Sequence, residues 1–154
     1  MATEIERKWL ARPDVAPPFA LAKAKYDIKQ CYMWNSPNLT LRLRASNDNF
    51  IFTMKGKSSE DGLERSEKEC SVWGFIAKPI MWLLRNRTLS KTRWVIPYKK
   101  QDFEVDVFDG RHLGLTLIEL ELKTRAIRVK KPKWVGKEVT GDVAYYNASI
   151  IKRK

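Results

Sequence analysis

The chain has 154 residues, of which 44% are hydrophobic, and this is enough for one domain with a buried core. Its formal net charge of +12 favours a polyanionic partner. No stretch approaches the roughly 20 apolar residues of a membrane-spanning helix, and the two cysteines form neither a disulfide framework nor a CxxC metal site. We therefore expect a cytoplasmic protein without a membrane partner.

The elements predicted for the N-terminal half are mainly strands. Alternation of apolar and polar residues, and turn-forming clusters such as Ser46-Asn47-Asp48-Asn49, set their limits. A short helix is expected at residues 19–25. The strands are expected at residues 1–8, 29–34, 39–45, 50–55 and 63–72.

The C-terminal half is predicted to mix strands with two further helices. Apolar residues near helical spacing predict a helix at 75–87, in which Pro79 has to lie in the first turn or bend the helix. Thr140 is expected to cap a last helix at 142–151, after an irregular segment at 132–136. Strands are expected at 89–96, 102–108 and 115–124. Because helices do not alternate with strands, an antiparallel sheet is favoured over βαβ units.

Charged residues recur on one face of strand after strand. Since successive side chains of a strand point to opposite faces, Glu4, Glu6 and Lys8 share one face. The same spacing groups Arg42 with Arg44, Thr53 with Lys55, Arg65 with Glu67 and Glu69, Lys91 with Arg93, Glu104 with Asp106, and Glu119 with Glu121 and Lys123.

Two interpretations of this pattern are open. In an ordinary sheet, the ionic face lies in water. In a closed eight-stranded barrel, the ionic faces line a lumen and helices cover the apolar exterior. Arg and Lys would then bind phosphate oxygens, and carboxylate pairs would hold Mg²⁺ or Mn²⁺. The segregation of acidic and basic pairs by strand favours the barrel.

The motifs on these strands resemble those of the CYTH family, also called triphosphate tunnel metalloenzymes. Glu4-Ile5-Glu6-Arg7-Lys8 is similar to the ExExK signature of the family, and the other matches follow in order over nearly the whole chain. They are Gln30-Cys31-Tyr32, Leu41-Arg42-Leu43-Arg44, Thr53-Met54-Lys55-Gly56, Arg65-Ser66-Glu67-Lys68-Glu69, Lys91-Thr92-Arg93, Glu104-Val105-Asp106-Val107-Phe108, Ile118-Glu119-Leu120-Glu121 and Lys137-Glu138-Val139-Thr140-Gly141-Asp142. The short N-terminus is most similar to those of small bacterial inorganic tripolyphosphatases.

The resemblance implies a mainly β (α+β) fold, in which one domain over residues 1–154 forms a closed eight-stranded antiparallel tunnel with helices packed outside. It implies hydrolysis of a triphosphate with Mg²⁺ or Mn²⁺. Phosphate binding is expected from Lys8, Arg42, Arg44, Lys55, Arg65 and Arg93. A first metal is expected at Glu4, Glu6, Glu119 and Glu121, and a second metal or the attacking water at Glu67 and Glu69. Lys91, paired with Tyr32, is expected to transfer protons. Glu104 and Asp106 are expected instead to be structural partners of the tunnel cations.

Several alternatives stay open at the level of sequence. The same tunnel suits a class IV-like adenylyl cyclase or a nucleoside or thiamine triphosphatase. A module that binds polyanions or nucleic acid without catalysis is the non-enzyme alternative, and the basic exterior can take a further polyanion. The sequence leaves open whether the chain forms a homodimer. Trp73, Trp82, Trp94 and Trp134 are expected to cover the wall as core residues.

Overall fold

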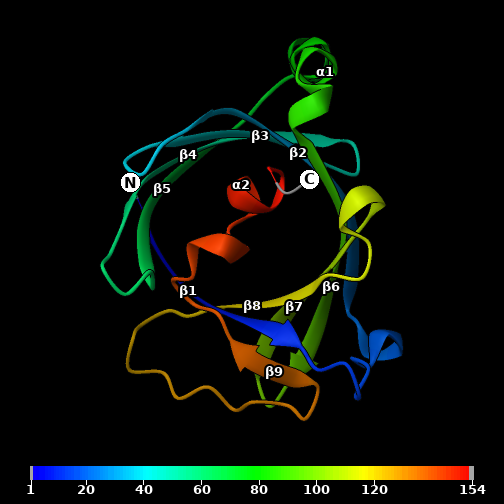
Figure 1. Ribbon diagram of the computed structural model, residues 1–154, viewed down its shortest axis with the longest axis vertical. Coiled ribbons are helices and arrows are strands. Elements are labelled where there is room, and N and C mark those ends of the chain that lie inside the picture. Colours follow the sequence, from blue (N-terminus) through cyan, green and yellow to red (C-terminus); the bar gives the residue numbers. More distant parts are fainter. Residues whose placement is uncertain (1, 153–154) are drawn as a thin grey trace.

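The computed structural model describes residues 2–152, and most of them lie in β-strands (Figure 1). The strands are β1 (Ala2–Ala11), β2 (Ala24–Asn35), β3 (Thr40–Ser46), β4 (Asn49–Ser58), β5 (Glu64–Ser71), β6 (Thr88–Tyr98), β7 (Gln101–Phe108), β8 (Thr116–Glu121) and β9 (Val135–Glu138). The two α-helices of this range are α1 (Gly74–Leu83) and α2 (Asn147–Ile150), and single 3₁₀ turns are η1 (Phe19–Leu21), η2 (Arg85–Arg87), η3 (Gly110–His112) and η4 (Val143–Tyr145). No helix within residues 2–152 has the length and apolar character needed to cross a membrane.

Eight of the strands close into an antiparallel barrel, as the resemblance implies. The order is β5-β4-β3-β2-β6-β7-β8-β1, and β5 pairs again with β1. The first residues of β1, Ala2 to Ile5, pair with β5, whereas Trp9 and Ala11 pair with β9 on the same edge. The ninth strand therefore extends the wall beyond the end of β5 without taking part in the closure.

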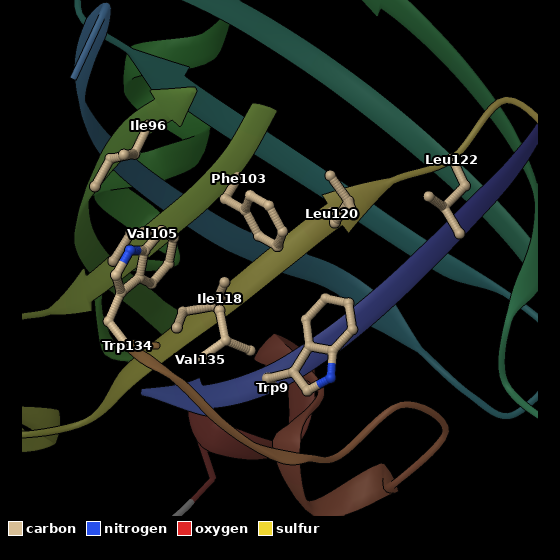
Figure 2. Packing of buried hydrophobic residues seen from close by; sticks show 9 residues of the cluster. All are labelled: Trp9, Ile96, Phe103, Val105, Ile118, Leu120, Leu122, Trp134 and Val135. Carbon is tan, nitrogen blue, oxygen red and sulfur yellow. The ribbon is translucent and has the colours of Figure 1, made fainter. Parts of the chain in front are cut away.

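The outer face of the barrel carries a large apolar core over β1, β6, β7 and β8. Trp9, Phe103 and Ile118 of this core have no exposed surface. Figure 2 shows that Trp134, directly before β9, and Val135, the first residue of β9, lie over these side chains. This part of the wall is therefore covered by a segment without helical structure, which differs from the expectation that helices cover it.

Helix α1 covers the outer face on the other side, over β2 and β3. Its Ala77 is fully buried and belongs to one cluster with Cys31 and Leu43. The helix ends at Leu83, and the rest of the predicted segment 75–87 forms η2. The expectation for the tryptophans is wrong at two positions, because Trp73 and Trp82 are 72% and 67% exposed.

The predicted helices at both ends of the chain are largely replaced by other structure. Only η1 forms within residues 19–25, because β2 already begins at Ala24. The predicted helix at 142–151 is divided into η4 and α2 by the extended backbone of Tyr146, at φ −71° and ψ 135°. Asp142, not Thr140, is the N-cap, and its side chain accepts a hydrogen bond from the backbone of Ala144.

Helix α2 packs inside one end of the barrel, so that the expectation of helices outside holds for α1 only. Buried Ile150 of α2 contacts a cluster that includes Leu89, Phe108 and Leu117. Each of these lies two residues from a member of the ionic ladder, and therefore on the same inner face. In Figure 1, α2 lies within the ring of strands. The C-terminal segment thus closes one end of the tunnel with apolar side chains.

Candidate active site

The ionic faces of the strands point into the barrel. Lys55 on β4 contacts Glu4 on β1 at 2.5 Å, although β5 lies between the two strands. Arg42 on β3 likewise reaches Glu69 on β5 at 3.5 Å, past β4. Such contacts between strands that are not neighbours are expected on the concave side of a closed sheet, where side chains converge. This supports the lumen, as opposed to the solvated face, as the place of the charges.

Lys8 lies between two carboxylates. Its Nζ is 2.8 Å from Glu119 Oε1 and 3.3 Å from Glu6 Oε1. Burial alone would lower the pKa of Lys8, but the charges of Glu119 and Glu6 outweigh it and raise this pKa above its ordinary value. The pKa of Glu6 is itself raised, by burial and by repulsion from Glu119. One ammonium group therefore neutralises two carboxylates in part.

Lys55 stands in an equivalent position between Glu4 and Glu67. Its Nζ lies 2.5 Å from a carboxylate oxygen of each. Burial, together with the neighbouring Glu4, raises the pKa of Glu67 to about 7. The pKa of Glu4 ends below its ordinary value, since Lys55 outweighs the effect of its burial. The site therefore contains two carboxylate pairs, each neutralised in part by a single ammonium group.

The arginines of β3 have donors without acceptors. The Nε atoms of Arg42 and Arg44 are buried and have no hydrogen-bond partner within residues 2–152. Burial, and then the charge of Arg42, lower the pKa of Arg44, because a second cation close by disfavours its charged form. A buried donor without a partner is costly. An oxygen-rich anion in the tunnel would satisfy both guanidinium groups.

Arg93 of β6 is more strongly paired than Arg42 and Arg44. It contacts Asp106 at 2.7 Å, Glu119 at 2.5 Å, and Glu104. Burial, with repulsion from Glu119 and Asp106, raises the pKa of Glu104 to about 7, although Arg93 opposes this shift. Glu104 and Asp106 are therefore ion-pair partners of cations in the tunnel.

Lys91 and Tyr32 both lie in the buried wall but have different partners. Lys91 is 2% exposed and donates a hydrogen bond to Asp106. The hydroxyl of Tyr32 accepts a hydrogen bond from Gln30 at 3.0 Å. Burial lowers the pKa of Lys91 and raises that of Tyr32 to about 12. The expected direct pairing of Lys91 with Tyr32 is not among the hydrogen bonds of residues 2–152.

Two predicted site residues occupy less central positions. Arg65 donates to the carbonyl oxygen of Gly56 at 2.5 Å and to Thr40 Oγ1 at 2.8 Å, so that it ties the wall of the tunnel together. Glu121 is exposed at the end of β8, opposite Glu6, and no cation of the described range lies within ion-pair distance of it.

Glu69, by contrast, lies within the site. It accepts a hydrogen bond from Thr53 at 2.8 Å and faces both arginines of β3.

Two further residues of the site were not predicted. Gln30 orients Tyr32, and the spacing of two between them could have indicated that they share a face. The ring of Tyr146 lies 6.0 Å from Lys8 Nζ. No sequence pattern points to Tyr146, because it enters the tunnel only through the return of the C-terminal segment.

The carboxylates fit a divalent cation that is held jointly with a phosphate compound. Within residues 2–152, no three His, Cys, Asp or Glu side chains converge closely enough to hold a metal by themselves. They form pairs instead, Glu4 with Glu67 and Glu6 with Glu119, around Lys55 and Lys8. Mg²⁺ is typically bound by one or two carboxylates together with substrate phosphates. The carboxylate oxygens suit such an ion, and a bound cation would favour the charged forms of Glu6 and Glu67, which burial disfavours.

The tunnel opens at the end opposite α2. An open pocket of about 670 Å³ lies there, and it reaches Arg44, Arg93 and Glu104 in the interior. Tyr26, Ile28, Phe50, Ile51 and Val72 supply the apolar part of its lining. A charged ligand can therefore enter from this side and meet the guanidinium groups first.

Comparisons with known proteins agree with this geometry. The inorganic triphosphatase of Acetivibrio thermocellus is 33% identical to this chain over 153 residues, which cover 99% of this chain and 95% of that protein. The inorganic triphosphatase of Nitrosomonas europaea is also 33% identical, over 154 residues and 96% of each chain. The crystal structure of the inorganic triphosphatase NE1496 superposes with a TM-score of 0.64 at 29% identity, over 98% of this chain and 95% of that one.

A scan against protein-family models finds no match. The full-length identity to the two curated relatives and the shared closed barrel nevertheless lead to one conclusion. The chain belongs to the CYTH family of triphosphate tunnel metalloenzymes, among the inorganic triphosphatases.

Proposed function

We propose that this chain is a metal-dependent hydrolase of inorganic triphosphate. The main support for this proposal is that guanidinium N–H donors without acceptors and pairs of carboxylates lie in the same tunnel. The buried Nε atoms of Arg42 and Arg44 lack acceptors, and carboxylate pairs face the same lumen. Phosphoryl transfer depends mainly on positioning and on stabilisation of charge. This arrangement provides both.

In this proposal, the triphosphate enters through the open pocket and lies along the inner wall. Lys8, Arg42, Arg44, Lys55 and Arg93 bind its oxygens, and Arg65, which is already hydrogen-bonded to the wall, has a lesser part. Glu4, Glu6, Glu67 and Glu119 hold Mg²⁺ or Mn²⁺, and Glu69 and Glu121 supply further oxygens. When bound, the metal neutralises phosphate charge and lowers the pKa of a bound water.

Lys91 is the residue that we assign to proton transfer. Burial lowers its pKa, with Arg93 acting in the same direction, while Asp106 fixes the position of its ammonium group. A Lys with a lowered pKa gives up its proton more readily than an ordinary Lys. Because Gln30 already donates to the hydroxyl oxygen of Tyr32, that hydroxyl has its own proton free to donate into the lumen.

The test is phosphate release from tripolyphosphate by the purified chain. Activity is expected with Mg²⁺ or Mn²⁺ and none with a chelator. Arg44→Gln is expected to raise KM, since it removes a phosphate ligand, whereas Arg111→Gln, at an exposed turn, serves as the control. Absence of turnover with both metals and every triphosphate tested would show that the chain is not a hydrolase.

A second candidate function is chemistry on an organic triphosphate. The apolar lining of the pocket, Tyr26, Ile28, Phe50, Ile51 and Val72, could contact a base or another organic group. Product analysis separates the cases: hydrolysis of ATP releases phosphate, whereas cyclisation releases pyrophosphate and a cyclic nucleotide. Thiamine triphosphate tests a second organic group on the same site.

A non-catalytic role in binding polyanions has a different signature. Such binding would weaken steeply with salt and would be indifferent to a chelator. The carboxylates in the tunnel argue against it, because they repel phosphate unless a cation is present.

We also propose a cytoplasmic location. Both cysteines are free thiols, Cys31 buried and Cys70 exposed, which accords with this proposal.

A further inference from the structure

Helix α1 exposes a continuous apolar face to solvent. The face consists of Trp73, Phe75, Ile76, Trp82 and Leu83, which are between 45% and 72% exposed. Within the helix, positions 75, 76, 82 and 83 lie on one side, with Pro79 between them. Ala77, Ile80, Met81 and Leu84 lie on the opposite side and pack on the barrel. We refer to the exposed set as the α1 face.

The α1 face differs from the scattered apolar residues found on any protein surface. Leu21 and Leu113 are also exposed, but they lie in isolated 3₁₀ turns and at a loop. In the α1 face, by contrast, the rings of Trp73 and Phe75 pack edge to face, with centroids 5.9 Å apart. Exposed apolar patches of several large side chains usually mark a surface that contacts another molecule.

Cations border this face, and acids are missing from it. Lys78, Arg85 and Arg87 are exposed in and directly after α1, and Arg85 lies over the ring of Trp82 at 4.8 Å. Residues 70–101 contain no Asp or Glu. None of the three cations forms an ion pair within residues 2–152. The occupant of this face should therefore combine an apolar part with negative charge.

We propose that the α1 face docks on the surface of an anionic lipid bilayer. Trp and Phe side chains favour the boundary between headgroups and acyl chains, and neighbouring Lys and Arg residues are attracted to anionic headgroups. The chain as a whole has a charge of +12, which adds to this attraction. The initial expectation of no membrane partner rested on the lack of a spanning segment, which a surface-bound helix does not need.

Two other occupants fit the face less well. A second copy of the chain, related by a two-fold axis, would bring Lys78, Arg85 and Arg87 close to their own counterparts, and residues 70–101 of neither copy contain an acid to compensate. A nucleic acid would match the cations and could stack on the aromatic rings. It would, however, leave the aliphatic Ile76 and Leu83 without a partner.

The experiment is co-sedimentation of the full chain with vesicles of phosphatidylcholine, with or without phosphatidylglycerol. We expect binding to the vesicles that contain phosphatidylglycerol and little to the others. The double variant Trp82→Ser/Leu83→Ser should weaken this binding by roughly tenfold or more, because two exposed apolar anchors are lost. Arg85→Gln/Arg87→Gln should weaken it by a smaller factor that disappears at high salt.

Leu113→Ser is the matched control, since Leu113 is 79% exposed and lies outside the α1 face. Tripolyphosphate hydrolysis by Trp82→Ser/Leu83→Ser should equal that of the wild type, which separates this proposal from the proposed function. Failure of the wild type to sediment with either vesicle would overturn the proposal. So would equal binding by Leu113→Ser and Trp82→Ser/Leu83→Ser, or a dimer in analytical ultracentrifugation that the double variant abolishes without any vesicle binding.

Discussion

The ammonium group of Lys91 donates a hydrogen bond to Asp106, and both side chains are almost wholly withdrawn from solvent, at 2% and 0% exposure. Because Asp106 also contacts Arg93 at 2.7 Å, it keeps a cationic partner when Lys91 is removed. We therefore expect Lys91→Ala to fold but to lose most of its tripolyphosphatase activity. A loss of about 10² to 10⁴-fold in kcat is typical when an acid–base group is removed.

Steady-state hydrolysis of tripolyphosphate measures this loss, and circular dichroism verifies the fold. Lys29→Ala is the matched control, because Lys29 is exposed on the outer side of β2. If Lys91→Ala folds and turns over at nearly the wild-type rate, Lys91 has no part in proton transfer.

The raised pKa of Glu67 predicts how the stability of the metal-free protein depends on pH. Burial and Glu4 raise this pKa from 4.5 to about 7, so that between these values the folded state binds more protons than the unfolded state. Stability therefore falls as pH rises from about 5 to 8. Allowing for solvent screening and for the coupling to Glu4, we expect a loss of roughly 1–3 kcal/mol from this group.

Urea unfolding at several pH values in the presence of a chelator measures this dependence. Glu67→Gln should flatten the profile over the same range, whereas Glu60→Gln, in the exposed loop between β4 and β5, should leave it unchanged. Glu104 contributes in the same direction, since its pKa is also about 7. A profile of Glu67→Gln as steep as that of the wild type would contradict the assignment.

The ionic wall of the tunnel could be predicted because it depends on the simplest regularity of a strand. Side chains alternate, so that Glu4, Glu6 and Lys8 had to share a face whatever the rest of the fold. Segregation of charge by strand then favoured a lumen over a wet surface. The hydrogen-bond partners of Lys91 and Tyr32 could not be derived in this way, because they depend on the registers of β2, β6 and β7.

The C-terminal segment was predicted less well for a related reason. Its helical pattern is interrupted at Tyr146, and its course depends on a close approach of two backbones. Gly141, at φ 74°, packs against Gly62, at φ 70°, where a Cβ on Gly62 would lie 2.2 Å from the Cα of Gly141. Contacts between residues so distant in sequence leave no periodic signal.

Ile150 anchors α2 within the end of the tunnel. It is fully buried against Leu89, Phe108, Leu117 and Val139. Ile150→Ala should lower the free energy of unfolding by about 2–4 kcal/mol, because it removes buried methyl groups and leaves a cavity. Urea unfolding measures the change, and Ile127→Ala, at a residue that is 36% exposed, should cost less. Equal effects of the two variants would mean that α2 is not held in this position in solution.

The hairpin between β6 and β7 contains two residues with positive φ, and replacement of the second of them, Lys100, by glycine should stabilise the protein. Lys99 and Lys100 have φ angles of 47° and 64°, as in a two-residue turn with positive φ at both central positions. A side chain with a Cβ disfavours this conformation, which glycine adopts freely. We expect Lys100→Gly to raise the free energy of unfolding by about 1 kcal/mol. Lys100→Ala, which removes the same charge but keeps the Cβ, should show no such gain when both are compared with the wild type by urea unfolding. A gain of equal size in the two variants would attribute the effect to relief of charge repulsion, not to the backbone.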